Sequence, residues 1–248
     1  MDHITVQPDE TLEDLQLNGL KILQKKTGFR FGMDSVLLAH FADIRERDTV
    51  ADFGTGCGIL PLLLIGRNKG NHFYGFEIQE SIAEMAERSV RINHLENTVH
   101  IIQADAGKAP DYLAACSIDA VVCNPPYGIP GTVLSSPVRT RAVSRSQGKN
   151  TLELFFRSAF RVLKGRGRFI MVYPASQMLQ AMQMLQKAHL EPKKFQMVYP
   201  YENKPANLVL IEAVKDARPS LHPMPPLIVF DEKQILTNRL KSVYHIDK

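Results

Sequence analysis

The stretch Val121-Val122-Cys123-Asn124-Pro125-Pro126-Tyr127-Gly128 is the starting point for predicting the fold of this chain. Residues 119–123 form a short apolar run without alternation, which is typical of a buried strand. Two prolines follow, and because neither can donate to a sheet ladder, the strand has to end there. Ligands of open α/β sheets bind outside the carboxyl ends of the strands. The sequence therefore predicts a stiff turn at a binding edge.

The side chains of this turn indicate what it could bind. The Asn124 side-chain oxygen and the Pro125 carbonyl can both accept a hydrogen bond from an amino group. Pro126 stiffens the turn, and Tyr127 can stack on a flat ring. The pattern predicts recognition of an exocyclic amino group on a planar substrate. Because Pro-Pro-Tyr is also common in ordinary loops, the prediction depends on the rest of the chain.

Strands and helices alternate along most of the sequence. This alternation predicts an α/β fold with a doubly wound, mostly parallel sheet that ends in an antiparallel hairpin. Asp34 is predicted to N-cap a helix that runs to Phe41. The predicted strands are residues 49–53, 72–76, 99–103, 119–123, 169–173, 195–199 and 208–213. The predicted helices are residues 59–65, 81–94, 112–115, 152–163 and 175–189.

Three parts of the chain are expected. Residues 1–32 are predicted to form an N-terminal arm and a short hairpin, which pairs residues 20–23 with 29–31. Residues 33–214 are the main domain. Residues 215–248 are a C-terminal extension with an apolar run at residues 227–230 and a possible last helix.

The composition limits the class of protein. The chain has 248 residues, of which 44% are hydrophobic and 23% are charged, as expected for one large domain or for one domain with a small appendage. It contains no apolar run that could span a bilayer and does not begin like a signal peptide. The three cysteines, Cys57, Cys116 and Cys123, lack metal-ligand spacing. We expect a cytoplasmic protein that binds neither metal nor membrane, and the composition leaves its oligomeric state open.

A glycine-rich loop follows the first strand of the main domain. Gly54-Thr55-Gly56-Cys57-Gly58 matches neither the dinucleotide fingerprint nor the phosphate loop. Asp52 would repel a pyrophosphate but suits a cationic ligand group. Glu77 comes 77 − 54 = 23 residues after Gly54, close to the roughly 20-residue spacing of an acid that binds ribose. With Asp105 after the third strand, this set fits a ligand that has a ribose and an amino group but no phosphate, although each acid could instead be a helix cap or a solvated residue.

The net charge of the chain, +4, is matched by one segment. Residues 127–150 contain no acidic residue and are rich in Ser, Gly and Pro. They are predicted to form a long, mobile loop that contacts phosphates, with a solvated surface loop as the alternative. The basic residues of this segment are Arg139, Arg141, Arg145 and Lys149.

Together these motifs resemble, in order and spacing, the S-adenosylmethionine-dependent amino-methyltransferases. The resemblance implies a seven-stranded class I methyltransferase sheet with S-adenosyl-L-methionine as cofactor, and a turn at residues 124–127 that holds the target nitrogen. The residues implied to bind the cofactor are Asp52, Gly54, Thr55, Gly56, Glu77, Ile78, Asp105 and Ala106.

Residues 28–39 and 205–212 resemble a narrower group, the bacterial enzymes that methylate the adenine amino group beside the anticodon of valine tRNA. This resemblance implies tRNA as partner, with Phe31 and Asp34 on the substrate side together with the basic segment. Guanine amino-methyltransferases of ribosomal RNA, protein glutamine methyltransferases and a non-catalytic cofactor-binding module that docks RNA are the alternatives. The glutamine enzymes carry a helical domain in front of the fold, whereas some thirty residues precede it here.

Overall fold

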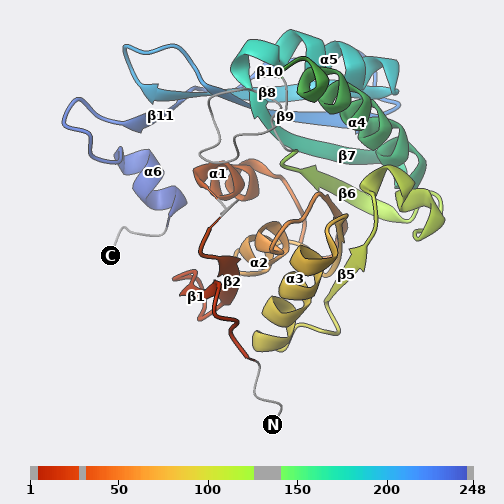
Figure 1. The fold of residues 1–248 in the computed structure, drawn as a ribbon. Coiled ribbons are helices and arrows are strands. Elements are labelled where there is room, and N and C mark those ends of the chain that lie inside the picture. Colours follow the sequence, from red (N-terminus) through yellow and green to blue (C-terminus); the bar gives the residue numbers. More distant parts are fainter. Residues whose placement is uncertain (1–4, 28–31, 126–140, 245–248) are drawn as a thin grey trace.

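The computed structural model describes the chain over residues 5–27, 32–125 and 141–244, with side chains for all of these except residues 141–150. Its centre is a nine-stranded sheet with the order β10-β8-β9-β7-β6-β3-β4-β5, in which β11 also pairs with β8 (Figure 1). The strands of this sheet are β3 (Thr49–Phe53), β4 (His72–Glu77), β5 (Val99–Gln103), β6 (Ile118–Cys123), β7 (Leu163–Pro174), β8 (Leu190–Tyr201), β9 (Leu208–Lys215), β10 (His222–Pro223) and β11 (Leu227–Phe230).

The predicted fold class is confirmed. Strands β3 to β7 pair in parallel, whereas β9 lies between β7 and β8 and is antiparallel to both. These seven strands form the expected sheet with its antiparallel hairpin. The C-terminal extension adds β10 and β11, which pair in parallel with β8 at the edge.

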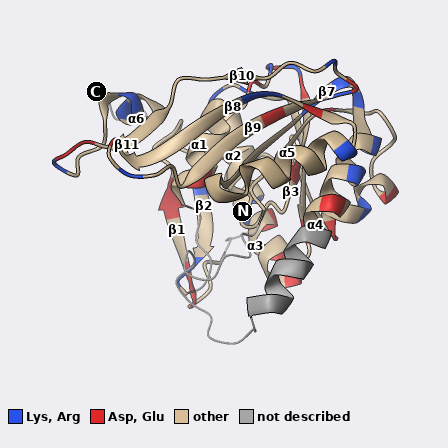
Figure 2. Cartoon of the chain, turned by 90° about the horizontal axis from the view of Figure 1, so that it is seen from above, with Lys and Arg blue, Asp and Glu red and all other residues tan. Residues whose placement is uncertain are grey.

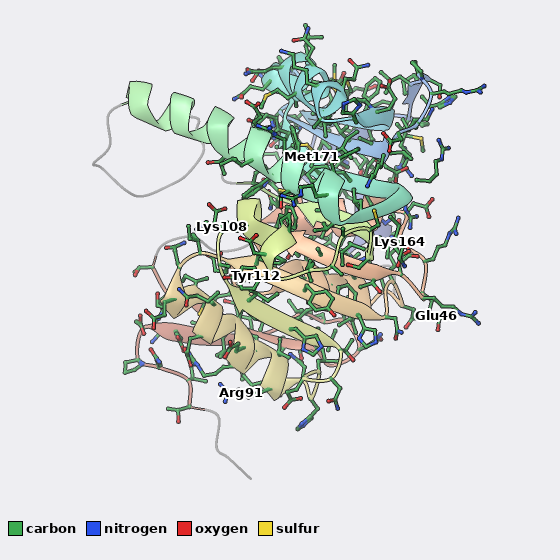
Figure 3. The ribbon with its side chains drawn as sticks, turned by 90° about the vertical axis from the view of Figure 1, so that its right-hand side faces the viewer. Glu46, Arg91, Lys108, Tyr112, Lys164 and Met171 are labelled. Carbon is green, nitrogen blue, oxygen red and sulfur yellow. The ribbon has the colours of Figure 1, made fainter. Side chains whose placement is uncertain are left out.

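Helices cover both faces of the sheet because its central strands are apolar on both sides. Along β6, Val122 packs toward a core with α1, α2, α3 and α6, while Val121 and Cys123 pack toward α4 and α5. In Figure 3, Met171 belongs to the core on the α4 and α5 side of the sheet. Lys108 and Tyr112 mark the region of the 3₁₀ helix η1. The helices are α1 (Met33–Phe41), α2 (Ile59–Ile65), α3 (Glu80–Ile92), η1 (Ala106–Asp111), α4 (Arg141–Val162), η2 (Ala175–Gln177), α5 (Met178–Lys187) and α6 (Asn238–Val243).

The N-terminal hairpin of the structure has a first strand that the sequence analysis did not predict, and residues 29–31 of the predicted hairpin lie outside the described residues. The structure pairs β1 (Glu10–Asp14) with β2 (Lys21–Lys25), so Glu10–Asp14 is a strand and not part of a loose arm. Glu10 is buried, and both of its carboxylate oxygens accept from the Arg88 guanidinium of α3 at 2.7 Å. The sequence of β1 is mostly acidic, so hydrophobic alternation could not reveal a strand that an ion pair docks onto the domain.

Two further predictions on the helices were wrong. The segment predicted as a loop up to residue 150 is helical from Arg141, where α4 begins. The apolar periodicity starts only at Leu152, so it indicated the packed part of α4 and missed its polar first turns. The short helix expected at residues 112–115 is replaced by η1, which lies just before it at Ala106–Asp111.

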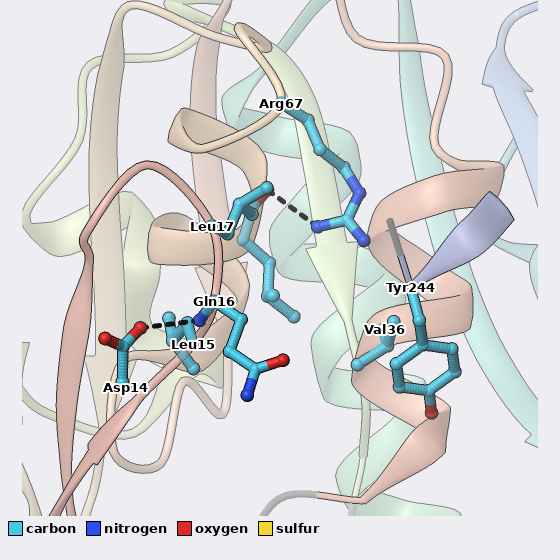
Figure 4. Close-up of a pocket in the computed structure, with 8 residues that line it drawn as sticks. Asp14, Leu15, Gln16, Leu17, Val36, Arg67 and Tyr244 are labelled. Carbon is cyan, nitrogen blue, oxygen red and sulfur yellow. Dashed lines mark hydrogen bonds between the residues drawn. The ribbon is translucent and has the colours of Figure 1, made fainter. Parts of the chain in front are cut away.

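Segments from both ends of the described chain pack next to α1. A cavity of about 160 Å³ lies between the turn after β1, α1, α2 and Tyr244 (Figure 4). Arg67 at its rim donates to the backbone carbonyls of Leu63 at 3.2 Å and Val243 at 2.9 Å. Leu240 and Val243 of α6 are buried in the same core as α1, and α6 contacts α1 directly. The C-terminal extension therefore supports α1 from the side that faces away from β6.

Lysine and arginine residues of the described ranges are spread over several elements and alternate with acidic residues (Figure 2). Three of these cations form ion pairs: Lys164 with Asp119, Arg168 with Asp48, and Lys194 with Glu212. No helix within residues 5–27, 32–125 and 141–244 is both long and apolar enough to cross a membrane.

Candidate active site

The glycine loop after β3 is attached to the end of β4. The backbone N–H groups of Gly54 and Thr55 both donate to the Phe76 carbonyl, at 3.0 and 2.9 Å. Gly54 and Gly56 adopt φ values of 79° and 56°, which favour glycine. A Cβ atom at either position would meet no heavy atom within 4 Å. The loop therefore presents bare backbone toward open space, as a close-fitting ligand requires.

Glu77, the last residue of β4, braces this loop from the neighbouring strand. Its Oε2 accepts from the Gly56 N–H at 3.1 Å, and its Oε1 accepts from the Gln79 N–H at 2.9 Å. The side chain is 7% exposed. Glu77 thus has a structural role that its spacing from Gly54 did not reveal.

Asp52 is the most unusual group of the site. It lies in β3, is 1% exposed, and neither carboxylate oxygen has a hydrogen-bond partner in the described part of the chain. Burial raises the pKa of Asp52 to about 7; the neighbouring Thr55 hydroxyl opposes this rise, and the nearby charge of Glu77 adds to it. The Thr55 hydroxyl is also buried beside this carboxyl, and it makes no hydrogen bond of normal geometry with a described residue. Unsatisfied polar groups beside an open loop indicate a site suited to a polar ligand.

The third acid, Asp105, caps a helix. It follows β5 and is half-buried, and its Oδ1 accepts from the Gly107 N–H at 2.8 Å, at the start of η1. Ile78 is 63% exposed, whereas Ala106 is buried. Since β3, β4 and β5 are neighbours in the sheet, the structure brings the residues that end these strands to one edge.

The Asn124 turn lies beside the glycine loop because β6 is the other neighbour of β3. Cys123 pairs with Phe53, so Asn124 and Gly54 leave the sheet on adjacent strands, about 5 Å apart in the pairing direction. Pro125 is buried, and the Asn124 Nδ2 donates to the Ser35 hydroxyl of α1 at 3.1 Å. An acceptor-bearing turn therefore stands next to a loop that is open toward a ligand.

Several predicted site residues lie outside the described residues. These are Phe31, Pro126, Tyr127 and Arg139. Arg141, Arg145 and Lys149 lie in the first part of α4, where only the backbone is described. Asp34 lies in the first turn of α1, but the predicted N-cap was wrong, because the N-cap is Gly32 and no side chain caps this helix.

Two residues of this region were missed by the sequence analysis. Ser35 holds the Asn124 amide, and Ser158 of α4 donates to the Ala106 carbonyl at 2.8 Å. Both serines are buried, at 2% and 3% exposure. Nothing in the sequence indicates these contacts, since the partners are 89 and 52 residues apart. Within the described ranges, no group of His, Cys, Asp and Glu side chains could hold a metal ion.

Two bacterial relatives are named tRNA1(Val) (adenine(37)-N6)-methyltransferase. The protein of Aliivibrio salmonicida is 26% identical over 185 residues, which cover 75% of this chain and 77% of the relative. The protein of Photobacterium profundum is 25% identical over 209 residues, which cover 84% and 86%.

Solved structures agree with the fold. A predicted O-methyltransferase from Agrobacterium tumefaciens superposes with a TM-score of 0.66 at 21% identity, covering 86% of this chain and 96% of the other. TYW2 of M. jannaschii in complex with AdoMet gives a TM-score of 0.57 at 16% identity, covering 84% and 86%. The sequence model of the methyltransferase small domain matches residues 33–197, which is more than half of the chain. This chain therefore belongs to the methyltransferase small domain family.

Proposed function

We propose that this protein transfers a methyl group from S-adenosylmethionine to the exocyclic amino group of an adenine in RNA, the adenosine beside the anticodon of valine tRNA. The observation that carries the proposal is the pairing of β3 with β6, because it sets the open glycine loop beside the Asn124 turn. The names of the bacterial relatives support the choice of substrate.

The described residues fit the proposed cofactor. Open space above Gly54 and Gly56 admits a ligand against the backbone, and the unpartnered carboxyl of Asp52 suits a cationic amino group. Glu77 would accept from ribose hydroxyls with the lone pairs that Gly56 and Gln79 leave over. Thr55, Ile78, Asp105 and Ala106 complete the proposed cofactor site. When bound, the cofactor supplies a methyl group on a sulfonium centre that a nitrogen can attack.

The Asn124 turn would prepare the target nitrogen. An adenine amino group is a weak nucleophile because its lone pair is delocalised into the ring. Acceptors at the Asn124 side chain and the Pro125 carbonyl would favour a pyramidal nitrogen with its lone pair directed at the methyl group. Asn124 is neutral, so the proton leaves to water after the attack. Pro126 would stiffen this turn, and Tyr127 and Phe31 would stack on a flipped base.

Positively charged side chains would bind the phosphates of the RNA. We place Arg139, Arg141, Arg145 and Lys149 on the phosphates, since these residues directly follow the turn and precede the packed part of α4. Asp34 would lie on the substrate side, at the start of α1. A tRNA substrate and three free cysteines are consistent with a cytoplasmic location.

Methyl transfer from labelled cofactor tests the proposal. Incubation with bulk tRNA should label an N6-methylated adenosine, and nucleoside mapping should place it beside the valine anticodon. Replacing Asn124 with alanine should lower turnover by about 100-fold or more while leaving cofactor affinity nearly intact. With a cell extract as acceptor, labelling that survives ribonuclease but not protease would replace the RNA substrate by a protein glutamine.

A further inference from the structure

We infer that Ser35 is a positioning residue for Asn124: its buried hydroxyl holds the amide nitrogen of Asn124 and so decides which end of the amide faces the substrate. The inference rests on the proposed function for its catalytic consequence. It is carried by a contact that joins two distant elements, the first turn of α1 and the end of β6, with Asn124 Nδ2 donating to Ser35 Oγ at 3.1 Å.

Ser35 stands on a firmly held helix. It is 2% exposed, and the four residues after it in α1 are 0–6% exposed. The carboxyl end of α1 is fixed by Lys69, whose Nζ donates to the carbonyls of Ala39 and His40 at 3.0 Å each. Since α6 contacts α1 as well, the helix cannot shift without disturbing several buried contacts. The serine is therefore a stationary acceptor for the amide of Asn124.

An asparagine side chain needs such a partner because its amide is nearly symmetric in shape. Rotation by about 180° exchanges the oxygen, which accepts, and the nitrogen, which donates two hydrogen bonds. A target amino group is itself a donor, so a rotated amide would present donor to donor and repel it. By taking the nitrogen, Ser35 turns the oxygen of Asn124 away from α1. The oxygen is then held as a preorganised acceptor.

Steady-state methyl transfer separates this role from a general effect on folding. Replacing Ser35 with alanine should lower kcat by about 10-fold. The KM for tRNA and the cofactor dissociation constant should stay within about two-fold, because the substitution removes no contact between the protein and either ligand. The conservative variant Ser35→Thr should restore most of kcat. Should Ser35→Ala fail to fold, Ser35→Cys keeps the volume and offers only a weak acceptor.

A matched control is available elsewhere in the chain. Ser89 on α3 is also fully buried, and its hydroxyl accepts from the Leu23 N–H at 3.0 Å and donates to the Met85 carbonyl at 3.2 Å. Ser89→Ala removes an equally buried hydroxyl and should leave kcat of the folded protein unchanged. In an Asn124→Ala background, Ser35→Ala should change the residual rate by less than about two-fold, because the residue acts through Asn124.

A second readout does not need activity. The side-chain NH₂ signal of Asn124, assigned by its loss in Asn124→Ala, should shift in Ser35→Ala and stay in place in Ser89→Ala. An unmoved signal, or an equal loss of rate with and without Asn124, would overturn the inference. If the wild-type protein does not methylate tRNA but the signal moves, the proposed function fails and the positioning role stands.

Discussion

Replacing Asp52 with asparagine should make the ligand-free protein relatively more stable as the pH rises. In the fold, burial raises the pKa of Asp52 from 3.8 to about 7, so the carboxyl stays neutral up to that pH. In the unfolded chain the same carboxyl ionises from about pH 4 upward. Ionisation therefore favours the unfolded state between these two pH values, and the stability contributed by the neutral carboxyl is lost as the pH rises toward 7.

The size of the effect follows from the two pKa values. Between about pH 5 and about pH 8, wild type should lose about 2.5 kcal/mol of unfolding free energy relative to Asp52→Asn, which does not ionise. Comparing the two proteins at both pH values cancels the pH-independent effect of burying an amide.

Urea unfolding without cofactor measures this difference. Asp111→Asn, which replaces an exposed carboxylate in the same way, provides the matched control. Added S-adenosylmethionine should stabilise wild type more at about pH 8 than at about pH 6, because an ionised Asp52 can pair with the cofactor amino group. A gap between wild type and Asp52→Asn that stays constant from about pH 5 to pH 8 would refute the reasoning.

Three further perturbations test other parts of the structure. Glu77→Ala should weaken cofactor binding by about 1–3 kcal/mol in titration calorimetry, since the Gly56 and Gln79 N–H groups lose their acceptor together with the ribose; unchanged affinity would remove Glu77 from the site. Arg88→Ala should lower the unfolding free energy by at most about 3–5 kcal/mol, because buried Glu10 loses the guanidinium and keeps only Lys25 and the Gln7 N–H as partners. The Arg88 hydrogen bonds are the largest of the contacts that hold the pKa of Glu10 at about 2 instead of 4.5. Wild-type stability from this group should therefore be present above pH 4.5 and fall as the pH drops through about 2, and acid titration of Arg88→Ala should show a smaller loss. Replacing the four basic residues Arg139, Arg141, Arg145 and Lys149 with alanine should flatten the salt dependence of tRNA binding by a few units of slope with cofactor affinity unchanged, and an unaltered slope would place the RNA elsewhere.

The central elements could be predicted because their sequences carry strong signals. The strand Thr49–Phe53 and the helix Ile59–Ile65 have the bounds that the apolar runs and flanking glycines predicted. The glycine loop and Asn124 fall at neighbouring strand ends, as expected from a parallel sheet. In each case the physical cause is local: an apolar run bounded by residues that cannot continue the strand or helix.

The parts that could not be predicted depend on contacts distant in sequence. The strand β1 is held by the ion pair of Glu10 with Arg88, 78 residues away, and its own composition does not indicate a strand. The acceptor for the Asn124 amide, Ser35, is an ordinary serine in a buried helix until the fold brings the two together. Asp52 was predicted beside the ligand, but its raised pKa follows only from its burial in the fold.

The insertion of β9 between β7 and β8 has a consequence for synthesis of the chain on the ribosome. Val209, Leu210 and Ile211 of β9 are fully buried and fill the space between two strands that are made earlier. From the end of β7 at Pro174 to the end of β9 at Lys215 the ribosome adds 215 − 174 = 41 residues. At about 5–20 residues per second, a newly made β7 waits about two to eight seconds with an unpaired edge. During that interval the nascent chain presents an apolar strand that is open to pairing with other chains, which makes it a candidate for chaperone binding.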